Sequence, residues 1–339
     1  MKAVLMPAPG QVEIIDLDEP QPGPEEVLLE VHYVGLCGSD LNMYRGAMAI
    51  VSYPRIPGHE LSGVIVAKGR QVPNSIREGD RVTVSPYSEC GLCPACRAGR
   101  PNCCQFNQTL GLQRDGAMSS TFAIDYRKVF ASKVLTLQEL ALVEPLSVGY
   151  HAANRGRVSE LDTVLVIGCG TIGMGVIAAV ARKGATVIAV DVDDDKLAGA
   201  RKLGAQIAVN STRQDVLAIA RELTDGEGVS VAIEAVGLPD TFRLAVEAVA
   251  FAGRVVYVGY AKQEVCYDTT PFVRKELDIL GARNALRVFP AVIKMLEKRE
   301  RPFTDLITRI YPLAETAQAF HDWDAAPGEF TKILIDVRA

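Results

Sequence analysis

Apolar and polar residues alternate along short runs up to about residue 150, for example in Glu26–Val34 and Arg81–Ser85. A period of two is typical of half-buried β-strands, and proline and glycine turn signals separate the runs. The pattern therefore predicts a mostly β domain in the first part of this 339-residue chain.

The pattern changes near Val158, where continuous apolar runs begin to alternate with helical segments. The apolar runs read VLVIG, TVIAVD, QIAVN, SVAIEAVG and RVVYVGY, and the segments between them include Lys196–Leu203 and Asp215–Glu222. Buried strands that alternate with helices indicate βαβ units and a doubly wound parallel sheet of the Rossmann type. The predicted fold class is therefore α/β, combined with the β domain.

After about Asn284 the pattern predicts one amphipathic helix, Pro290–Arg299, followed by short strand-like runs that end in KILIDV. We expect this C-terminal piece to rejoin the first domain. The predicted domains are residues 1–152 together with 285–339, and residues 153–284.

Composition narrows the possible partners and the compartment. A formal net charge of −5 argues against a nucleic-acid binder, which needs a basic face. The uncharged stretch Thr163–Ala181 is nearly long enough to cross a bilayer, but a glycine cluster divides it into strand, turn and helix, so we reject a membrane span. The N-terminus lacks the apolar run and cleavage site of a signal peptide, so a cytoplasmic protein with reduced thiols is expected.

Four cysteines follow the pattern C-x2-C-x2-C-x7-C, namely Cys90, Cys93, Cys96 and Cys104. Thiolates at such short spacing converge on one tetrahedral Zn²⁺ in a closed, structural site. The alternative is a disulfide framework, which needs an oxidising compartment. Because a closed zinc site does no chemistry, the reactive groups must lie elsewhere.

A glycine motif, G-x-G-x-x-G, follows the first apolar run and opens a helix; it comprises Gly168, Cys169, Gly170, Thr171, Ile172 and Gly173. In this context the motif predicts a dinucleotide site, with the phosphates at the helix N-terminus. Asp191 ends the next strand, where a carboxylate binds the ribose hydroxyls of NAD and repels a 2′-phosphate. A helix N-cap is the alternative for Asp191. Lys196 either assists at the adenosine end or is a solvated helix lysine.

Three further motifs carry candidate chemistry: CGSD at Cys37, GHE at His59 and EPL at Glu144. Each alone is as readily explained by a buried core residue or a surface acid. Together with GDRV, the cysteine cluster and the glycine motif, they resemble the zinc-dependent medium-chain dehydrogenases over essentially the whole chain. EPLSVG resembles the sorbitol dehydrogenase branch, and the cysteine segment and GARNA resemble bacterial polyol and sugar-acid dehydrogenases of the L-galactonate type.

The resemblance implies a GroES-like catalytic domain and a catalytic zinc bound by Cys37, His59 and Glu144, with Glu60 adjacent. One thiolate, one neutral imidazole and one carboxylate make Zn²⁺ formally neutral, which still permits Lewis-acid chemistry. We therefore expect Glu60 outside the ligand set, or as a transient ligand. The family spacing also assigns Cys104, rather than the adjacent Cys103, to the second zinc in a lobe at residues 86–104.

The implied reaction oxidises a secondary alcohol to a ketone with hydride transfer to NAD. Ser39 is the expected first proton acceptor. Many relatives continue the relay through a histidine where this chain has Asn42, which cannot titrate near neutral pH. Val148 is expected against the nicotinamide ring, although burial in a core helix explains it equally well.

The substrate is the least resolved feature. Arg114, Arg283 and Asn284 lie in segments that, by resemblance, approach substrate or cofactor, and an arginine there can bind a carboxylate in a bidentate manner. Structural ion pairs are the alternative. The expected partner is thus a small polyol or sugar acid, with a threonine 3-dehydrogenase or a non-catalytic zinc- and NAD-binding protein as rivals. A homo-oligomer, dimer or tetramer, is expected from the resemblance.

Overall fold

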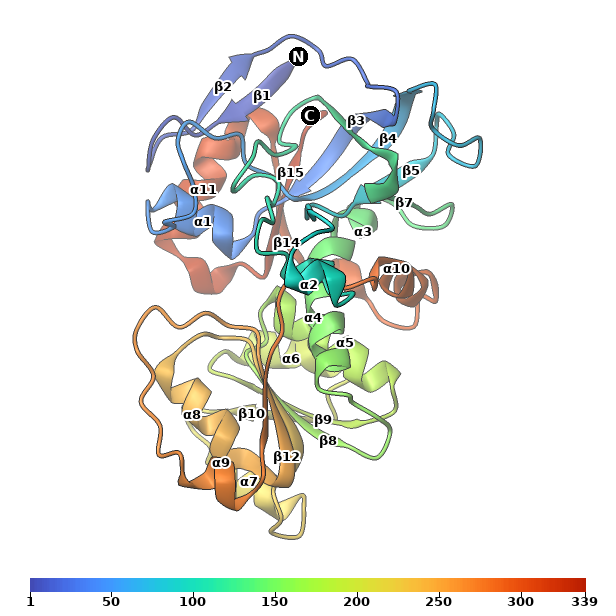
Figure 1. Ribbon diagram of the computed structural model, residues 1–339. Coiled ribbons are helices and arrows are strands. Elements are labelled where there is room, and N and C mark those ends of the chain that lie inside the picture. Colours follow the sequence, from blue (N-terminus) through green and yellow to red (C-terminus); the bar gives the residue numbers. More distant parts are fainter. The chain divides into compact units, whose positions relative to one another are not determined.

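A computed structural model describes all residues, 1–339 (Figure 1). The chain forms two compact units. The first unit comprises Met1–Glu144, Phe289–Glu300 and Thr304–Ala339, and the second comprises Pro145–Val288 and Arg301–Phe303. The units divide between residues 144 and 145 and between 288 and 289, whereas we expected divisions after residues 152 and 284.

The first unit is built on a seven-stranded sheet with the order β14-β15-β3-β4-β5-β7, in which β6 also pairs with β3. A separate antiparallel pair, β1 and β2, completes its strands. The strands are β1 (Lys2–Leu5), β2 (Glu13–Asp16), β3 (Glu26–Gly35), β4 (Glu60–Lys68), β5 (Arg81–Val84), β6 (Thr121–Asp125), β7 (Val129–Ala131), β14 (Ile307–Pro312) and β15 (Lys332–Asp336).

The C-terminal strand β15 pairs antiparallel with β3, so strands from the two ends of the sequence lie side by side in one sheet. The red and blue ribbons of Figure 1 show this pairing. Apolar residues of β3 and β15 enter one core cluster with Phe320, whose ring stacks on Tyr44 at 5.3 Å between centroids. The helices of this unit are α1 (Gly38–Tyr44), α2 (Pro94–Arg97), α3 (Leu137–Ala141), α10 (Phe289–Glu297) and α11 (Thr316–Ala325).

The second unit contains a six-stranded sheet with the order β10-β9-β8-β11-β12-β13, and every pair in it is parallel. This arrangement is the predicted doubly wound sheet. Its strands are β8 (Thr163–Ile167), β9 (Thr186–Asp191), β10 (Ile207–Asn210), β11 (Val229–Glu234), β12 (Val249–Tyr257) and β13 (Asp278–Gly281). Its helices are α5 (Thr171–Arg182), α6 (Asp194–Lys202), α7 (Val216–Glu222), α8 (Pro239–Ala248) and α9 (Thr270–Arg274), and the division between the units falls within α4 (Val143–Arg155).

The apolar stretch Thr163–Ala181 forms β8, the glycine turn and most of α5, as its glycine cluster predicts. Parallel strands are covered on both faces, which explains why the run carries no polar alternation. No helix in the structure has both the length and the apolarity needed to cross a membrane.

Two leucines at the start of this unit allow a matched test of its core. Leu165 in β8 is fully buried, whereas Leu161, four residues earlier, is 90% exposed. Leu165→Ala should lower the free energy of unfolding by about 2–5 kcal/mol, because it leaves a cavity among packed strands. Leu161→Ala should change it by less than about 0.5 kcal/mol. Urea denaturation of both variants checks this, and equal midpoints would contradict the burial of β8.

Candidate metal centres and cofactor site

The four predicted cysteines converge in the first unit. The sulfur atoms of Cys90, Cys93, Cys96 and Cys104 all lie within 4.8 Å of one another. Zn–S bonds of about 2.3 Å place the corners of a tetrahedral thiolate site about 3.8 Å apart. The Sγ atoms of Cys93 and Cys104 are separated by 3.9 Å, so the cluster has the dimensions that zinc requires.

Backbone amides stabilise thiolates in this cluster. The N–H groups of Leu92 and Cys93 donate to Cys90 Sγ at 3.4 and 3.3 Å. Hydrogen bonds from the backbone of Cys96 and Gln105 lower the pKa of Cys93 to about 6. Burial instead raises the pKa of Cys96 to about 12, so the backbone favours the thiolate form, which zinc binds, at Cys90 and Cys93.

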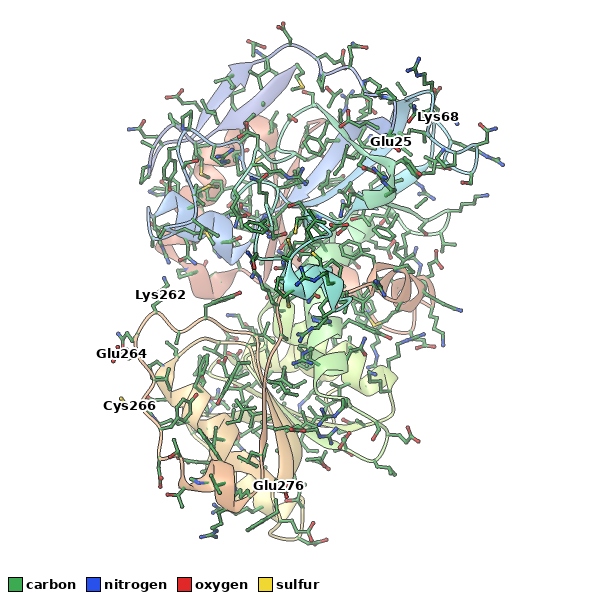
Figure 2. The ribbon with its side chains drawn as sticks, in the orientation of Figure 1. Glu25, Lys68, Lys262, Glu264, Cys266 and Glu276 are labelled. Atoms are coloured by element: carbon green, nitrogen blue, oxygen red, sulfur yellow. The ribbon has the colours of Figure 1, made fainter.

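The other cysteines lie outside the cluster. Cys103 Sγ is 3.8 Å from Arg100 Nη2, while its neighbour Cys104 is buried and its sulfur lies close to the other three. The structure thus brings Cys104, and not Cys103, to the cluster. Cys266 is exposed beside Lys262 and Glu264 on the loop between β12 and α9 (Figure 2).

A second cluster in the first unit joins Cys37, His59 and Glu60, whose ligand atoms lie within 4.8 Å of one another. Cys37 is the N-cap of α1, so its side chain projects from the helix start. His59 immediately precedes β4 and Glu60 is its first residue, which places both at the end of a central strand. His59 and Glu60 are buried and Cys37 is half-buried, and one thiol, one imidazole and one carboxylate form a zinc donor set.

Asp40 and Lys332 are charged side chains that contact this cluster. Asp40 Oδ2 accepts a hydrogen bond from the backbone N–H of Cys37 at 2.9 Å, and its Oδ1 lies 3.8 Å from His59 Nδ1. Lys332 donates to a Glu60 carboxylate oxygen and, at 2.9 Å, to the carbonyl oxygen of Leu36. Because Nδ1 faces Asp40, Nε2 of His59 is left for a metal.

The cluster attracts positive charge. Burial lowers the pKa of His59, but the Asp40 carboxylate and the Cys37 thiol raise it more, so the pKa lies well above its ordinary value. Burial raises the pKa of Asp40. Groups that hold protons this tightly form an environment that a divalent cation would stabilise, so the residues present fit zinc.

Glu144, the expected third ligand, is buried but does not belong to the close trio. Its Oε1 accepts a hydrogen bond from the Tyr87 hydroxyl, and burial raises its pKa to about 7. It still contributes to the electrostatic environment of His59. Glu60, which we expected either outside the ligand set or as a transient ligand, is the carboxylate that the structure brings close to Cys37 and His59.

Ser39 lies in the first turn of α1, between Cys37 and Asp40. Its Oγ is buried and has no hydrogen-bond partner. A buried hydroxyl without a partner is costly unless a ligand uses it. Asn42 lies on the same helix, where its carbonyl oxygen accepts from Ala47.

The glycine motif lies in the second unit between β8 and α5. Gly168 has a φ of +97°, and a Cβ on Gly173 would lie 1.8 Å from the Gly168 carbonyl oxygen, so both positions require glycine. Gly170 is the N-cap of α5, which begins with Thr171 and Ile172. The glycine motif thus leads directly into the N-terminus of α5, where it predicts that the cofactor phosphates bind.

Asp191 ends β9, as expected, and its carboxylate faces the motif. Asp191 Oδ2 accepts from the Cys169 N–H at 2.7 Å, and Oδ1 accepts from the Val192 N–H at 2.8 Å. The carboxylate is therefore held at the strand end. The N-cap of α6 is Asp193, which removes the alternative role for Asp191.

Comparison with known proteins gives the family. Residues 23–134 match the alcohol dehydrogenase GroES-like domain, and residues 171–298 match the zinc-binding dehydrogenase domain. The chain belongs to the zinc-binding alcohol dehydrogenases. The predicted combination of a Rossmann sheet with a GroES-like domain is confirmed.

Relatives of this dehydrogenase align along nearly its full length. It is 34% identical to the sorbitol dehydrogenase of Bacillus subtilis, covering 99% of this chain and 97% of that protein. It is 29% identical to the L-galactonate-5-dehydrogenase of Escherichia coli, covering 94% of each. A solved structure of an Escherichia coli alcohol dehydrogenase complexed with NADH superposes with a TM-score of 0.91 at 31% identity, covering 99% of each chain.

Sequence reasoning missed three residues of the dehydrogenase site: Asp40, Tyr87 and Lys332. Asp40 stands three residues after Cys37, and a capping box at a helix start was the available signal. Tyr87 and Lys332 carried no local signal, since their partners lie 57 and 272 residues away.

The remaining predicted residues are distributed over both units. Arg114 is half-buried in the first unit. Val148 is half-buried on α4, Lys196 lies on α6, and Arg283 and Asn284 follow β13, all within the second unit.

The adjacent cysteines of this dehydrogenase provide a matched metal test. Cys104→Ser should lower the zinc content of the purified protein by one atom per chain, because it removes a converging thiolate. Cys103→Ser should leave the zinc content unchanged. Atomic emission analysis measures both. Zinc loss from the Cys103 variant alone would show that the last turn of the lobe is arranged differently.

Proposed function

We propose that this dehydrogenase oxidises a secondary hydroxyl of a polyol or sugar acid to a ketone, with hydride transfer to NAD. The observation that carries the proposal is the convergence of Cys37, His59 and Glu60 together with the buried Ser39 hydroxyl, which has no hydrogen-bond partner and lies on the same helix turn as Cys37. It combines a cation site with a proton-transfer group.

Cys37 and His59 would hold the catalytic zinc together with a carboxylate. Zinc bound there acts as a Lewis acid that lowers the pKa of a substrate hydroxyl. Glu144 is our proposed third ligand, and Glu60 would serve as an alternate ligand. The ion pair with Lys332 supports an exchange of the two, because it offsets the charge that Glu60 would otherwise add.

Ser39 would accept the proton of the substrate hydroxyl. Its burial without a partner supports this role, because an alcohol at the site would satisfy it. From Ser39 the proton would leave through the cofactor ribose or water, since Asn42 cannot titrate.

NAD is supported by two observations. The Asp191 carboxylate is held by backbone N–H groups at the end of β9, and three further aspartates follow within the next four residues, so negative charge would repel a 2′-phosphate. The related Escherichia coli structure contains NADH. Gly168, Gly170, Thr171, Ile172 and Gly173 would bind the pyrophosphate, with Lys196 at the adenosine end and Val148 against the nicotinamide.

The polyol or sugar-acid class is supported by the relatives, of which one is a sorbitol dehydrogenase and one an L-galactonate dehydrogenase. Arg283 and Asn284 would approach the cofactor or substrate.

The direct test is NADH formation over a panel of alditols, aldonates and L-threonine. We expect turnover of a polyhydroxy compound, and Cys37→Ala should reduce it at least about 10³-fold while the cysteine-cluster zinc remains bound. Turnover confined to threonine, or full activity of the Cys37 variant, would refute the proposal.

Asp191→Ser tests the cofactor preference. Removal of the carboxylate should reduce the ratio of kcat/KM for NAD to that for NADP by roughly 10- to 100-fold, because the repulsion of the 2′-phosphate is lost. Steady-state kinetics with both cofactors measure the ratio. An unchanged ratio would show that a residue other than Asp191 binds the ribose.

A further inference from the structure

We propose that Arg114 binds an oxyanion carried by the substrate, so that the preferred substrate is an anionic polyhydroxy compound. This inference rests on the proposed function and narrows its substrate class. The ligand chemistry is a carboxylate or phosphate group, and the experiment below distinguishes the two.

The segment that carries Arg114 is bound to the residues that precede the metal centre. The N–H groups of Gly116 and Ala117 donate to the carbonyl oxygens of Ile56 and Gly58 at 2.8 and 3.0 Å. Gly58 is the residue before His59. A Cβ on Gly116 would lie 2.4 Å from the Gly58 carbonyl oxygen, so the contact is as close as two backbones allow.

The other end of the segment is held near Tyr87. The Leu110 N–H donates to the Pro86 carbonyl oxygen at 3.1 Å, and Leu110 forms a β-bridge with Arg114. Pro86 precedes Tyr87, whose hydroxyl binds Glu144. Backbone hydrogen bonds therefore fix the chain on both sides of Arg114, next to His59 on one side and next to Tyr87 on the other.

Within the protein, the Arg114 guanidinium has no counter-ion. Its Nε is buried and has no hydrogen-bond partner. The adjacent Asp115 pairs with Arg55 at 2.9 Å, and Glu89, the acid that acts on Arg114 at longer range, pairs with Lys128. Both nearby carboxylates thus already have cations of their own.

An unpaired, half-buried guanidinium is unfavourable, and burial lowers the pKa of Arg114 accordingly. A ligand oxyanion would remove this cost. The planar guanidinium offers parallel N–H groups that match a carboxylate or phosphate, whereas a neutral polyol supplies only weaker acceptors. The unmatched charge therefore favours an anionic ligand.

The test compares alditols, aldonates and alditol phosphates of the same carbon number and of gluco, galacto and manno configuration. In Arg114→Met, the ratio of kcat/KM for the best anionic substrate to that for the matched alditol should fall roughly 10- to 100-fold. Arg114→Lys should give a ratio between those of Arg114→Met and the wild type, because lysine keeps the positive charge but lacks the parallel N–H groups of the guanidinium. Loss with aldonates identifies a carboxylate, and loss with alditol phosphates identifies a phosphate.

Arg127→Met is the matched control, because Arg127 belongs to the same unit but is paired with Asp125 and with Glu25, which Figure 2 labels. It should leave the ratio unchanged. If the wild-type enzyme prefers alditols, or if Arg114→Met leaves the ratio unchanged, the inference is wrong while the proposed function stands.

If no polyhydroxy compound is oxidised, the proposed function fails, and calorimetric titration of the NAD-bound enzyme with gluconate and inorganic phosphate decides the inference separately. The inference is supported if gluconate or phosphate binds more weakly to Arg114→Met than to the wild type. It is overturned if both proteins bind these anions equally, or if the wild type does not bind them.

Discussion

Buried negative charge is the constraint on which the metal centre depends. Asp40, Glu60 and Glu144 are all buried near His59, and Lys332 is the one buried lysine that faces them. Several carboxylates with a single ammonium group are unstable in a low-dielectric interior unless protons or a cation join them. The Asp40 carboxylate and the Cys37 thiol raise the pKa of His59, and burial raises the pKa of Asp40, so the site favours added positive charge. A divalent ion supplies it.

The two clusters of the first unit differ in whether buried polar atoms remain without partners. Around Cys90, four sulfurs converge, and backbone N–H groups donate to Cys90 Sγ, so the cluster itself supplies all four ligands of a closed zinc site. Around Cys37, by contrast, Ser39 Oγ remains buried without a hydrogen bond, while His59 Nδ1 and Asp40 Oδ1 face each other at 3.8 Å. Complete satisfaction is typical of a structural site, and unsatisfied polar atoms are typical of a site that awaits substrate or metal.

Features encoded by neighbouring residues could be predicted from the sequence. The run from Thr163 through the glycine motif to α5 was predicted because strand, turn and helix signals are all local. Asp40, Tyr87 and Lys332 could not be predicted, since their significance depends on partners brought together by the sheet. The first division between the units falls within the continuous helix α4, where no turn residue in the sequence marks a boundary.

The pairing of β15 with β3 has a consequence for the order in which the protein matures. Glu60 is made early in synthesis, but the lysine that neutralises it, Lys332, follows 272 residues later. Until β15 has left the ribosome and paired with β3, Glu60 has no ammonium partner. The sheet also lacks one of the strands that pair with β3. The metal centre therefore reaches its final charge only after β15 has been made and has paired with β3. A nascent or truncated chain would present zinc with a more negative and more open set of ligands than the finished protein does.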